Sequence, residues 1–344
     1  MRPIRKLISN LTLTGLLCSS ISAYASDFDL RLAHFMPATS WQQEQIFNAW
    51  KKSVEEDSNG QISVSIYPGQ TLGKAASGYD NAINGVADIS WTVQGYTAGR
   101  FPLSQIMELP GLFETGAVGS CAFQKLFNSG ALDDEYKETK VLYVHTHSPG
   151  HLHTRDKVVT SLDDLKGLRI RRPTTLIGDL LEGLGAQPVG MPAPEIYQSV
   201  QRGVIDGYML PWETIQSFQT FDVTKQHLEF GFYSLAFVTT MNKEAYDGLP
   251  DNLKAVIDKN SGMQWAVNAG RGYDEADKKA LVKIRQKGGQ VNTLEDSERE
   301  AWLSVANEVS RQYIASLDEK GLPGTETYEL VQDYVQECRS EIKL

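Results

Sequence analysis

The stretch between residues 161 and 213 constrains the fold more than any other part of the chain. Short apolar segments of strand character alternate there with helical segments that begin at capping residues. The predicted elements are a brief helix capped by Ser161, a strand over 168–171, a helix from Thr174 or Thr175 to Leu184, a segment over 187–189, a helix over 193–201 and a strand over 204–210. This alternation predicts a doubly wound parallel sheet.

Ligands of such sheets bind outside the carboxyl ends of the strands. Arg171 falls at the end of one predicted strand, and Trp212 and Glu213 follow the end of another. The stretch therefore predicts half of a ligand-binding cleft.

The amino-terminal part of the chain carries a second unit of the same kind. Its predicted strands cover 28–35, 62–67 and 88–92, and its predicted helices cover 41–56 and 75–84. Two such units in tandem predict two α/β domains that face each other. An apolar run from Phe232 to Met241 predicts a further strand, and the pattern is helical from Leu253 onward.

Several motifs, in the right order, resemble those of the extracytoplasmic solute-binding proteins of TRAP transporters. They are GQTLGKAASGYDNAINGVADISW, GYTAGRFPLSQIMELPGLF, LKGLRIRRPT and GMPAPEIYQSVQRGVIDG. The resemblance covers most of the mature chain. It implies a periplasmic binding protein-like α/β fold, with two domains around a central cleft, hinge strands and a helical carboxyl-terminal region.

In that family the chain crosses between the domains more than once, which makes each domain discontinuous. The resemblance therefore implies a first domain of residues 26–148 plus 232–262 and a second of 149–231 plus 263–344, with the carboxyl-terminal helices packing across both. Several crossings suit a hinge, because they restrict the motion to opening and closing.

The resemblance also implies a function, which is a solute receptor for an organic acid. Arg171 occupies the position of the family's carboxylate-binding arginine in the LKGLRIRR motif, and a guanidinium matches a carboxylate with paired donors. Without the resemblance, a solvated arginine at a strand end is the simpler interpretation. The closed receptor would dock on the small and large integral-membrane subunits of a TRAP transporter.

The residues around the proline that follows Leu210 bear on the ligand. Many dicarboxylate and sugar-acid binders of the family have an asparagine at this position, so Leu210 argues against those ligands. Trp212 offers a stacking face or packs in the hinge, and Glu213 can accept a hydrogen bond from a hydroxyl or a ring N–H. The other aromatic residues near predicted strand ends are Phe35, Trp91 and Tyr233, which can equally be core residues. Together they favour an aromatic or otherwise apolar monocarboxylate.

Four of the six histidines lie between residues 145 and 153. His151 and His153 fall near the position where related proteins often place a second basic ligand contact, so both are candidate ligand-binding residues. The alternative is a metal site, because histidine is a common metal ligand. No HExxH motif or evident carboxylate ligand accompanies them, so the expectation is neither a metal nor a cofactor.

The first 25 residues have a basic start, an apolar run and a small-x-small site, which predicts a Sec signal peptide cleaved after Ala25 and a periplasmic protein. A lipoprotein acylated at Cys18 is the alternative. The formal net charge of −10 becomes more negative once this basic segment is removed, which argues against binding to nucleic acid or to anionic lipid. Cys121 and Cys338 remain, either as a disulfide or as two buried thiols.

Other functions are less consistent with the sequence. The chain has no GxSxG, P-loop or GxGxxG motif, so catalysis is not expected. A solute-binding protein of an ABC importer or a chemoreceptor would share the cleft but not the membrane partner. A secreted metal-binding protein that uses the histidines is the third possibility.

Overall fold

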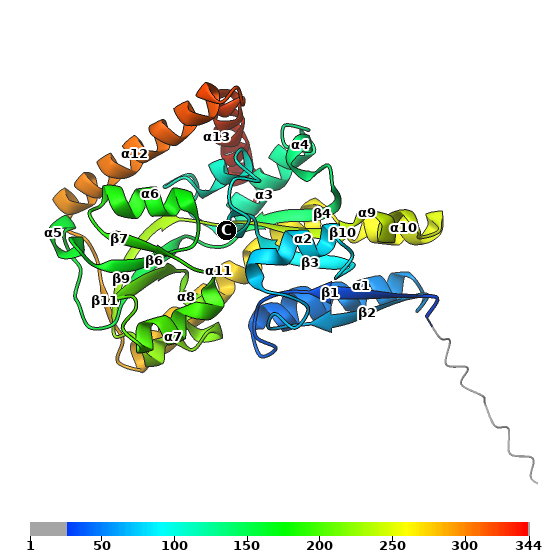
Figure 1. Cartoon of the computed structure of the whole chain (residues 1–344), viewed down its shortest axis with the longest axis horizontal. Coiled ribbons are helices and arrows are strands. Elements are labelled where there is room, and N and C mark those ends of the chain that lie inside the picture. The colour runs from blue at the N-terminus through cyan, green and yellow to red at the C-terminus, as the bar shows by residue number, and fades with distance from the viewer. Residues whose placement is uncertain (1–25, 343–344) are drawn as a thin grey trace, which may run out of the picture.

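The computed structural model describes residues 26–342 and contains two mixed β-sheets, each flanked by helices (Figure 1). The segment predicted to be a signal peptide, with Cys18 and Ala25, lies outside the described residues. We call the parts of the chain built on the first and second sheets domain I and domain II. The sheets agree with the predicted α/β architecture, while the residue bounds of the two domains stay a prediction.

The sheet of domain I has the order β2-β1-β3-β10-β4. Its strands are β1 (Phe28–Ala33), β2 (Ile62–Tyr67), β3 (Ile89–Val93), β4 (Thr139–Thr146) and β10 (Ala236–Asn242). The first three strands are parallel, and β10 runs antiparallel between β3 and β4.

The sheet of domain II has the order β11-β9-β5-β8-β6-β7. Its strands are β5 (Gly150–Thr154), β6 (Arg169–Arg172), β7 (Gln187–Gly190), β8 (Gly207–Leu210), β9 (Gln226–Tyr233) and β11 (Gln290–Asn292). Strands β6, β7 and β8 are parallel, as the 161–213 stretch predicts, whereas β5 is antiparallel to both β8 and β9.

Helices cover the sheets and connect the strands. In domain I they include a π-helix (Gln43–Asn48) that continues into α1 (Ala49–Asp57), then α2 (Gly78–Ile83), α3 (Gly116–Asn128), α4 (Asp133–Tyr136), α9 (Lys243–Asp247) and α10 (Asp251–Lys259). In domain II they are α5 (Leu162–Leu165), α6 (Thr175–Gly183), α7 (Ile196–Gln201) and α8 (Trp212–Ser217). Short 3₁₀ turns cover 75–77, 94–96, 104–108, 193–195 and 220–222.

Two local predictions need correction. The single strand predicted over 232–241 is two strands, because β9 ends at Tyr233 and β10 begins at Ala236 in the other sheet. Ser161 precedes α5 but makes no cap bond, since its hydroxyl instead donates to Asp164 at 3.0 Å. Thr174 does cap α6, with its hydroxyl oxygen accepting from the Ile177 amide.

The long helix α11 (Met263–Gln286) joins the two domains. Two acidic residues one turn apart hold the start of a helix in each domain. Asp274 accepts from the amides of Gly116 and Ala117 at the start of α3, and Asp277 accepts from the amide of Glu213 in α8 at 2.7 Å. Since carboxylates are favourable at helix amino-termini, α11 fixes one element of each domain at the hinge.

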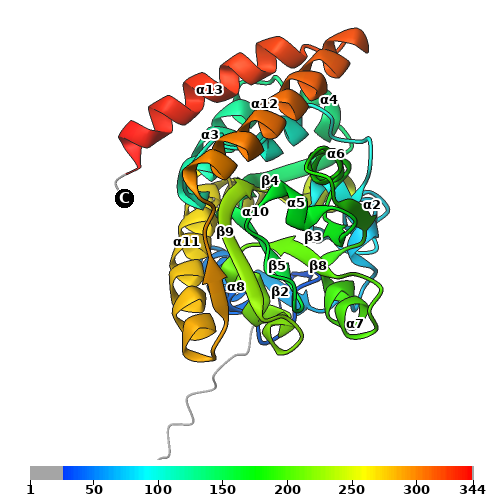
Figure 2. The same cartoon turned by 90° about the vertical axis from the view of Figure 1, so that its left-hand side faces the viewer.

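Two further helices, α12 (Asp296–Glu319) and α13 (Gly324–Glu341), form a hairpin on one side of the molecule (Figure 2). α12 packs on α6 of domain II, and α13 packs on α3 of domain I. A disulfide between Cys121 in α3 and Cys338 in α13 settles the question that the sequence left open. Among the described residues, no helix is both long and apolar enough to span a bilayer.

Candidate ligand-binding cleft

A mostly apolar cavity lies between the two domains. Domain I contributes Phe35, Met36, Trp91, Val93, Tyr96, His147, Leu235 and Phe237, domain II contributes Ala193, Leu210, Pro211, Glu213, Thr214 and Phe218, and α11 contributes Tyr273. Cavities lined by aromatic side chains with a few polar groups are typical of small-molecule sites. This is therefore the candidate ligand site.

The aromatic wall of the cavity is built on Trp91. The Trp91 ring stacks on Phe237 with centroids 4.8 Å apart and lies 4.9 Å from the ring of Phe35. Its indole N–H donates to His145 Nε2 at 2.8 Å, which leaves the ring faces for packing. Phe35 and Trp91, both predicted from their places near strand ends, thus lie together at the cavity.

Arg171 is fully buried on β6, yet no carboxylate of the described residues forms an ion pair with it. Its Nε donates to the Met191 carbonyl at 2.9 Å, and its Nη1 donates to the Met209 carbonyl at 3.0 Å. Its Nη2 donates to the Tyr96 hydroxyl at 3.2 Å, so Arg171 contacts the cavity wall through that tyrosine. A buried cation without an anionic partner is costly, and here carbonyl oxygens and a hydroxyl are its partners.

Tyr96 makes this contact across the cleft. It belongs to the turn after β3 in domain I, and its hydroxyl oxygen accepts from both Arg171 and the Ala193 amide of domain II. Those two bonds use the lone pairs of the oxygen and leave the Tyr96 O–H free to donate. The same side of the cavity therefore offers donors from both domains.

His147 and Tyr233 lie close to Arg171. His147 lines the cavity, and its Nδ1 contacts the Ser148 carbonyl, which makes Nδ1 the protonated nitrogen. Burial lowers the pKa of His147 to about 4, so the ring is neutral at working pH. Tyr233 meets the His147 ring edge-on at 5.5 Å but lies outside the cavity lining, and its hydroxyl has no partner among the described residues.

Glu213 lines the cavity from the first turn of α8 and is 2% exposed. Its Oε2 accepts from Trp41 Nε1 at 2.7 Å, from Gln42 Nε2 at 3.1 Å and from Ser217 Oγ at 3.2 Å. Its Oε1 has no partner among residues 26–342. Burial raises the pKa of Glu213 to about 7, so both protonation states are accessible near neutral pH.

Three of the predicted site residues lie together away from the cavity. Trp212 packs on His151 with ring centroids 4.4 Å apart, and His153 lies 5.3 Å from the same indole. His151 Nδ1 accepts from the amides of Phe230 and Gly231, and His153 contacts His227 and the Leu210 carbonyl. These hydrogen bonds hold β5 against β8 and β9.

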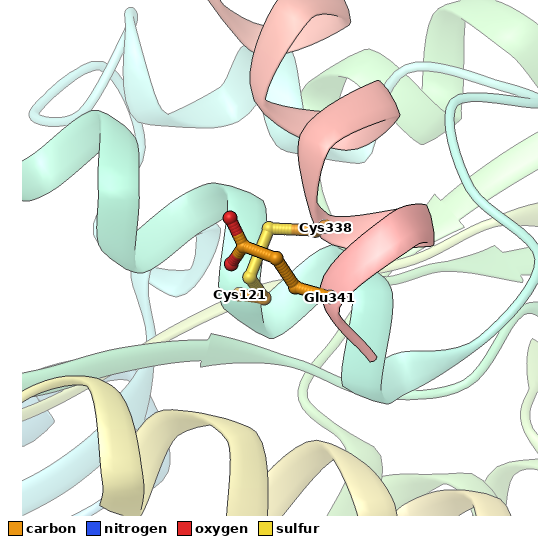
Figure 3. Close-up of side chains that lie close together, drawn as sticks. All are labelled: Cys121, Cys338 and Glu341. Atoms are coloured by element: carbon orange, nitrogen blue, oxygen red, sulfur yellow. A yellow bond between two sulfur atoms is a disulfide. The ribbon is translucent and has the colours of Figure 1, made fainter. Parts of the chain in front are cut away.

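Within residues 26–342, the histidines do not form part of any group of three potential metal ligands. Among the described residues, one group has three potential metal-ligand atoms within 4.8 Å of one another. It consists of Cys121, Cys338 and Glu341. Figure 3 shows that its two cysteines are joined to each other, and disulfide sulfurs are not thiolate ligands.

Sequence reasoning missed two of the polar residues at the cavity. His147 lies four residues before the predicted His151, and the chain bends at Ser148 before β5 begins at Gly150. Tyr273 comes from α11, far along the chain from every cleft motif. Only the packing of α11 against both domains brings it there.

Glu108 is a buried acid close to the cleft and contacts elements of both domains. Its Oε2 accepts from the Thr174 hydroxyl at 2.7 Å, and its Oε1 accepts from the Ala236 amide at 3.4 Å. Burial raises the pKa of Glu108 to about 8. The folded protein therefore holds a proton here that the unfolded chain releases near the usual value for glutamate.

We predict that this proton makes stability fall as the pH rises. A raised pKa means that the stabilisation is complete below the unfolded value and is lost as the pH passes through the folded value, here between about pH 4.5 and 8. Glu108→Gln cannot ionise, so its melting temperature should fall less between pH 6.5 and 8.5 than that of the wild type. The exposed Glu244→Gln serves as the control and should follow the wild-type slope.

Comparison with known proteins identifies the family of this chain. The model of "Bacterial extracellular solute-binding protein, family 7" matches residues 32–316. A TRAP solute-binding protein from Rhodoferax ferrireducens T118, crystallised with copurified benzoate, is 33% identical with a TM-score of 0.88, covering 91% of this chain and 99% of that one.

Two further relatives extend the comparison. A marine metagenome TRAP solute-binding protein specific for aromatic acid ligands, solved with metahydroxyphenylacetate, is 35% identical with a TM-score of 0.87, covering 90% of this chain and 99% of that one. The 2,3-diketo-L-gulonate-binding periplasmic protein YiaO of Escherichia coli K12 is 25% identical over 90% of this chain and 94% of its own length. The chain therefore belongs to family 7 of the bacterial extracellular solute-binding proteins, the organic-acid receptors of TRAP transporters.

Proposed function

We propose that this receptor binds an aromatic monocarboxylate, with the ligand carboxylate on Arg171 and the ring against the wall formed by Phe35, Trp91 and Phe237. The observation that carries the proposal is a buried arginine, without an acidic partner among the described residues, that is hydrogen-bonded to Tyr96 in the lining of an aromatic cavity. A carboxylate there would form the charge-assisted hydrogen bonds that Arg171 lacks.

The comparisons support an aromatic ligand over a sugar acid. The two solved relatives that are 33% and 35% identical were crystallised with benzoate and with metahydroxyphenylacetate. In this chain Leu210 and Pro211 line the cavity where many sugar-acid and dicarboxylate binders have an asparagine before the proline. An apolar side chain there favours a ring and leaves a second carboxylate without a partner.

The cleft closes, in this proposal, because the ligand contacts both domains only in the closed state. Arg171 and Ala193 belong to domain II, and Tyr96 reaches them from domain I. A ligand that binds one conformation more tightly shifts the population toward it. The closed receptor would then deliver its ligand in the periplasm to the TRAP membrane subunits, after removal of the signal peptide at Ala25.

The direct test is thermal unfolding of the mature protein in the presence of benzoate, phenylacetate, succinate and galacturonate. A ligand that binds only the folded state raises the melting temperature by mass action. We expect the aromatic acids to raise it and the other two to leave it unchanged. A rise with succinate or galacturonate alone would overturn the aromatic assignment.

Tyr96→Phe tests how the carboxylate is held across the cleft. Removing the O–H that is free to donate should weaken benzoate binding about tenfold, measured by titration calorimetry, because a hydrogen bond to a charged group is lost. Tyr246→Phe is the matched control, since its hydroxyl donates to Asp258 on the surface. Unchanged or tighter binding in Tyr96→Phe would show that this hydroxyl does not hold the ligand.

A further inference from the structure

The two oxygens of Glu213 are in different situations. Oε2 accepts three hydrogen bonds, two of them from Trp41 and Gln42 of domain I, so it holds the two domains together. Oε1 is buried and has no partner among the described residues, although Glu213 lines the cavity. A buried polar atom without a partner costs free energy unless a ligand supplies one.

We propose that Glu213 Oε1 binds a hydroxyl group on the ligand, so that the receptor selects hydroxylated aromatic monocarboxylates. This inference rests on the proposed function, in which Arg171 binds the carboxylate. No ion pair joins Glu213 to Arg171 in the described residues, so the two side chains offer separate polar contacts. A ligand with a carboxylate and a hydroxyl satisfies both of them, whereas an unsubstituted ring leaves Oε1 unpaired.

The protonation of Glu213 explains why the group is a hydroxyl. Because Oε2 already accepts three donors, a proton on this carboxyl resides on Oε1. Oε1 therefore accepts a hydrogen bond when Glu213 is ionised and donates one when it is protonated. A hydroxyl can do both, while an ether oxygen only accepts and an ammonium group only donates.

Other titratable groups around Glu213 affect this equilibrium in known directions. Asp277 and Tyr273 approach it from α11, and burial first, then the nearby negative charge of Glu213, keeps the pKa of each well above its usual value. From domain I, His147 also lines the cavity, but burial keeps it neutral above about pH 5. Among the described residues that line the cavity, Glu213 is thus the group that changes its protonation state between pH 6 and 8.

The test compares hydroxybenzoates and hydroxyphenylacetates with their methoxy counterparts by titration calorimetry at pH 6 and pH 8. At pH 8, where Glu213 is ionised, the wild type should bind at least one hydroxy acid about tenfold more tightly than its methoxy counterpart. At pH 6 the preference should shrink, because protonated Oε1 can donate to either oxygen. Equal affinities at pH 8, or a preference that does not change with pH, would overturn the proposal.

Glu213→Gln provides the matched variant. The donors Trp41 and Gln42 should select the amide oxygen for the Oε2 position, which places the NH₂ group at the Oε1 position as a donor. We expect the preference for hydroxy over methoxy acids to fall at least about fivefold at pH 8 and to lose its pH dependence. A preference that persists in this variant would also contradict the proposal.

The failure of the proposed function gives a different result. If no aromatic acid binds the wild type, or if binding survives Arg171→Ala, the carboxylate assignment fails and the hydroxyl assignment falls with it. If aromatic acids bind through Arg171 but hydroxy and methoxy acids bind equally, only the role of Glu213 is wrong.

Discussion

Arg171→Ala should weaken the binding of benzoate or a related aromatic acid at least about 30-fold, measured by titration calorimetry on the mature protein. Removing one member of a buried, hydrogen-bonded charge pair costs roughly 2–5 kcal/mol, because the other charge stays buried and unpaired. No cation in the described lining could replace Arg171, because the lining contains no lysine or arginine. Its histidine, His147, is neutral. The substitution leaves the Met191 and Met209 carbonyls without this donor, so a melting curve must accompany it.

The neighbouring strand position supplies the control. Arg169 lies two residues earlier on β6 and pairs with Asp206 at 2.7 Å on the surface, with 42% of its side chain exposed. Arg169→Ala removes the same charge from the same strand, but benzoate affinity should change less than about twofold, because exposed pairs contribute little. Arg171→Lys should recover only part of the affinity, since an ammonium cannot form the paired contact. Equal losses in the Arg169 and Arg171 variants would point to a general charge effect.

Much of the fold could be predicted because its parallel units are local. A strand such as β6 and the helix α6 that follows it are adjacent in sequence, so alternation and capping show them directly. The antiparallel strands β5 and β9 could not be found in this way. β5 carries two histidines and begins directly after Pro149, and its hydrogen bonds go to strands about 60 and 80 residues away.

The residues of the candidate site also fall into those that local sequence patterns reveal and those that depend on long-range packing. Phe35, Trp91 and Glu213 could be named because each lies at or just after the end of a predicted strand, whereas Arg171 also needed the family resemblance. Trp212 and Glu213 are adjacent, yet the first turn of α8 points one toward His151 and the other toward the cavity. Such a choice depends on the helix orientation set by Asp277, which no local pattern reveals.

Reducing the Cys121–Cys338 disulfide should lower the melting temperature of the mature protein by about 5–15 °C. The bond joins α3 to α13 across 217 residues of sequence, with Cα atoms 6.0 Å apart. A cross-link over so long a loop removes much of the freedom of the unfolded chain, which contributes about 3–5 kcal/mol. Lys125 also bonds Glu337 and Glu341 across the same helix pair, but these exposed contacts are too weak to replace it.

The double variant Cys121→Ala/Cys338→Ala separates the cross-link from other effects of reductant. It should melt close to the reduced wild type, and adding reductant to it should change nothing further. Benzoate affinity should be unaffected at low temperature, because neither cysteine lines the cavity. A melting temperature within about 2 °C of the oxidised wild type would mean that the packing of α13 on α3 holds that end of the hairpin without the bond. A large loss of benzoate affinity would instead show that the hairpin, which packs on both domains, helps to set the closed state of the cleft.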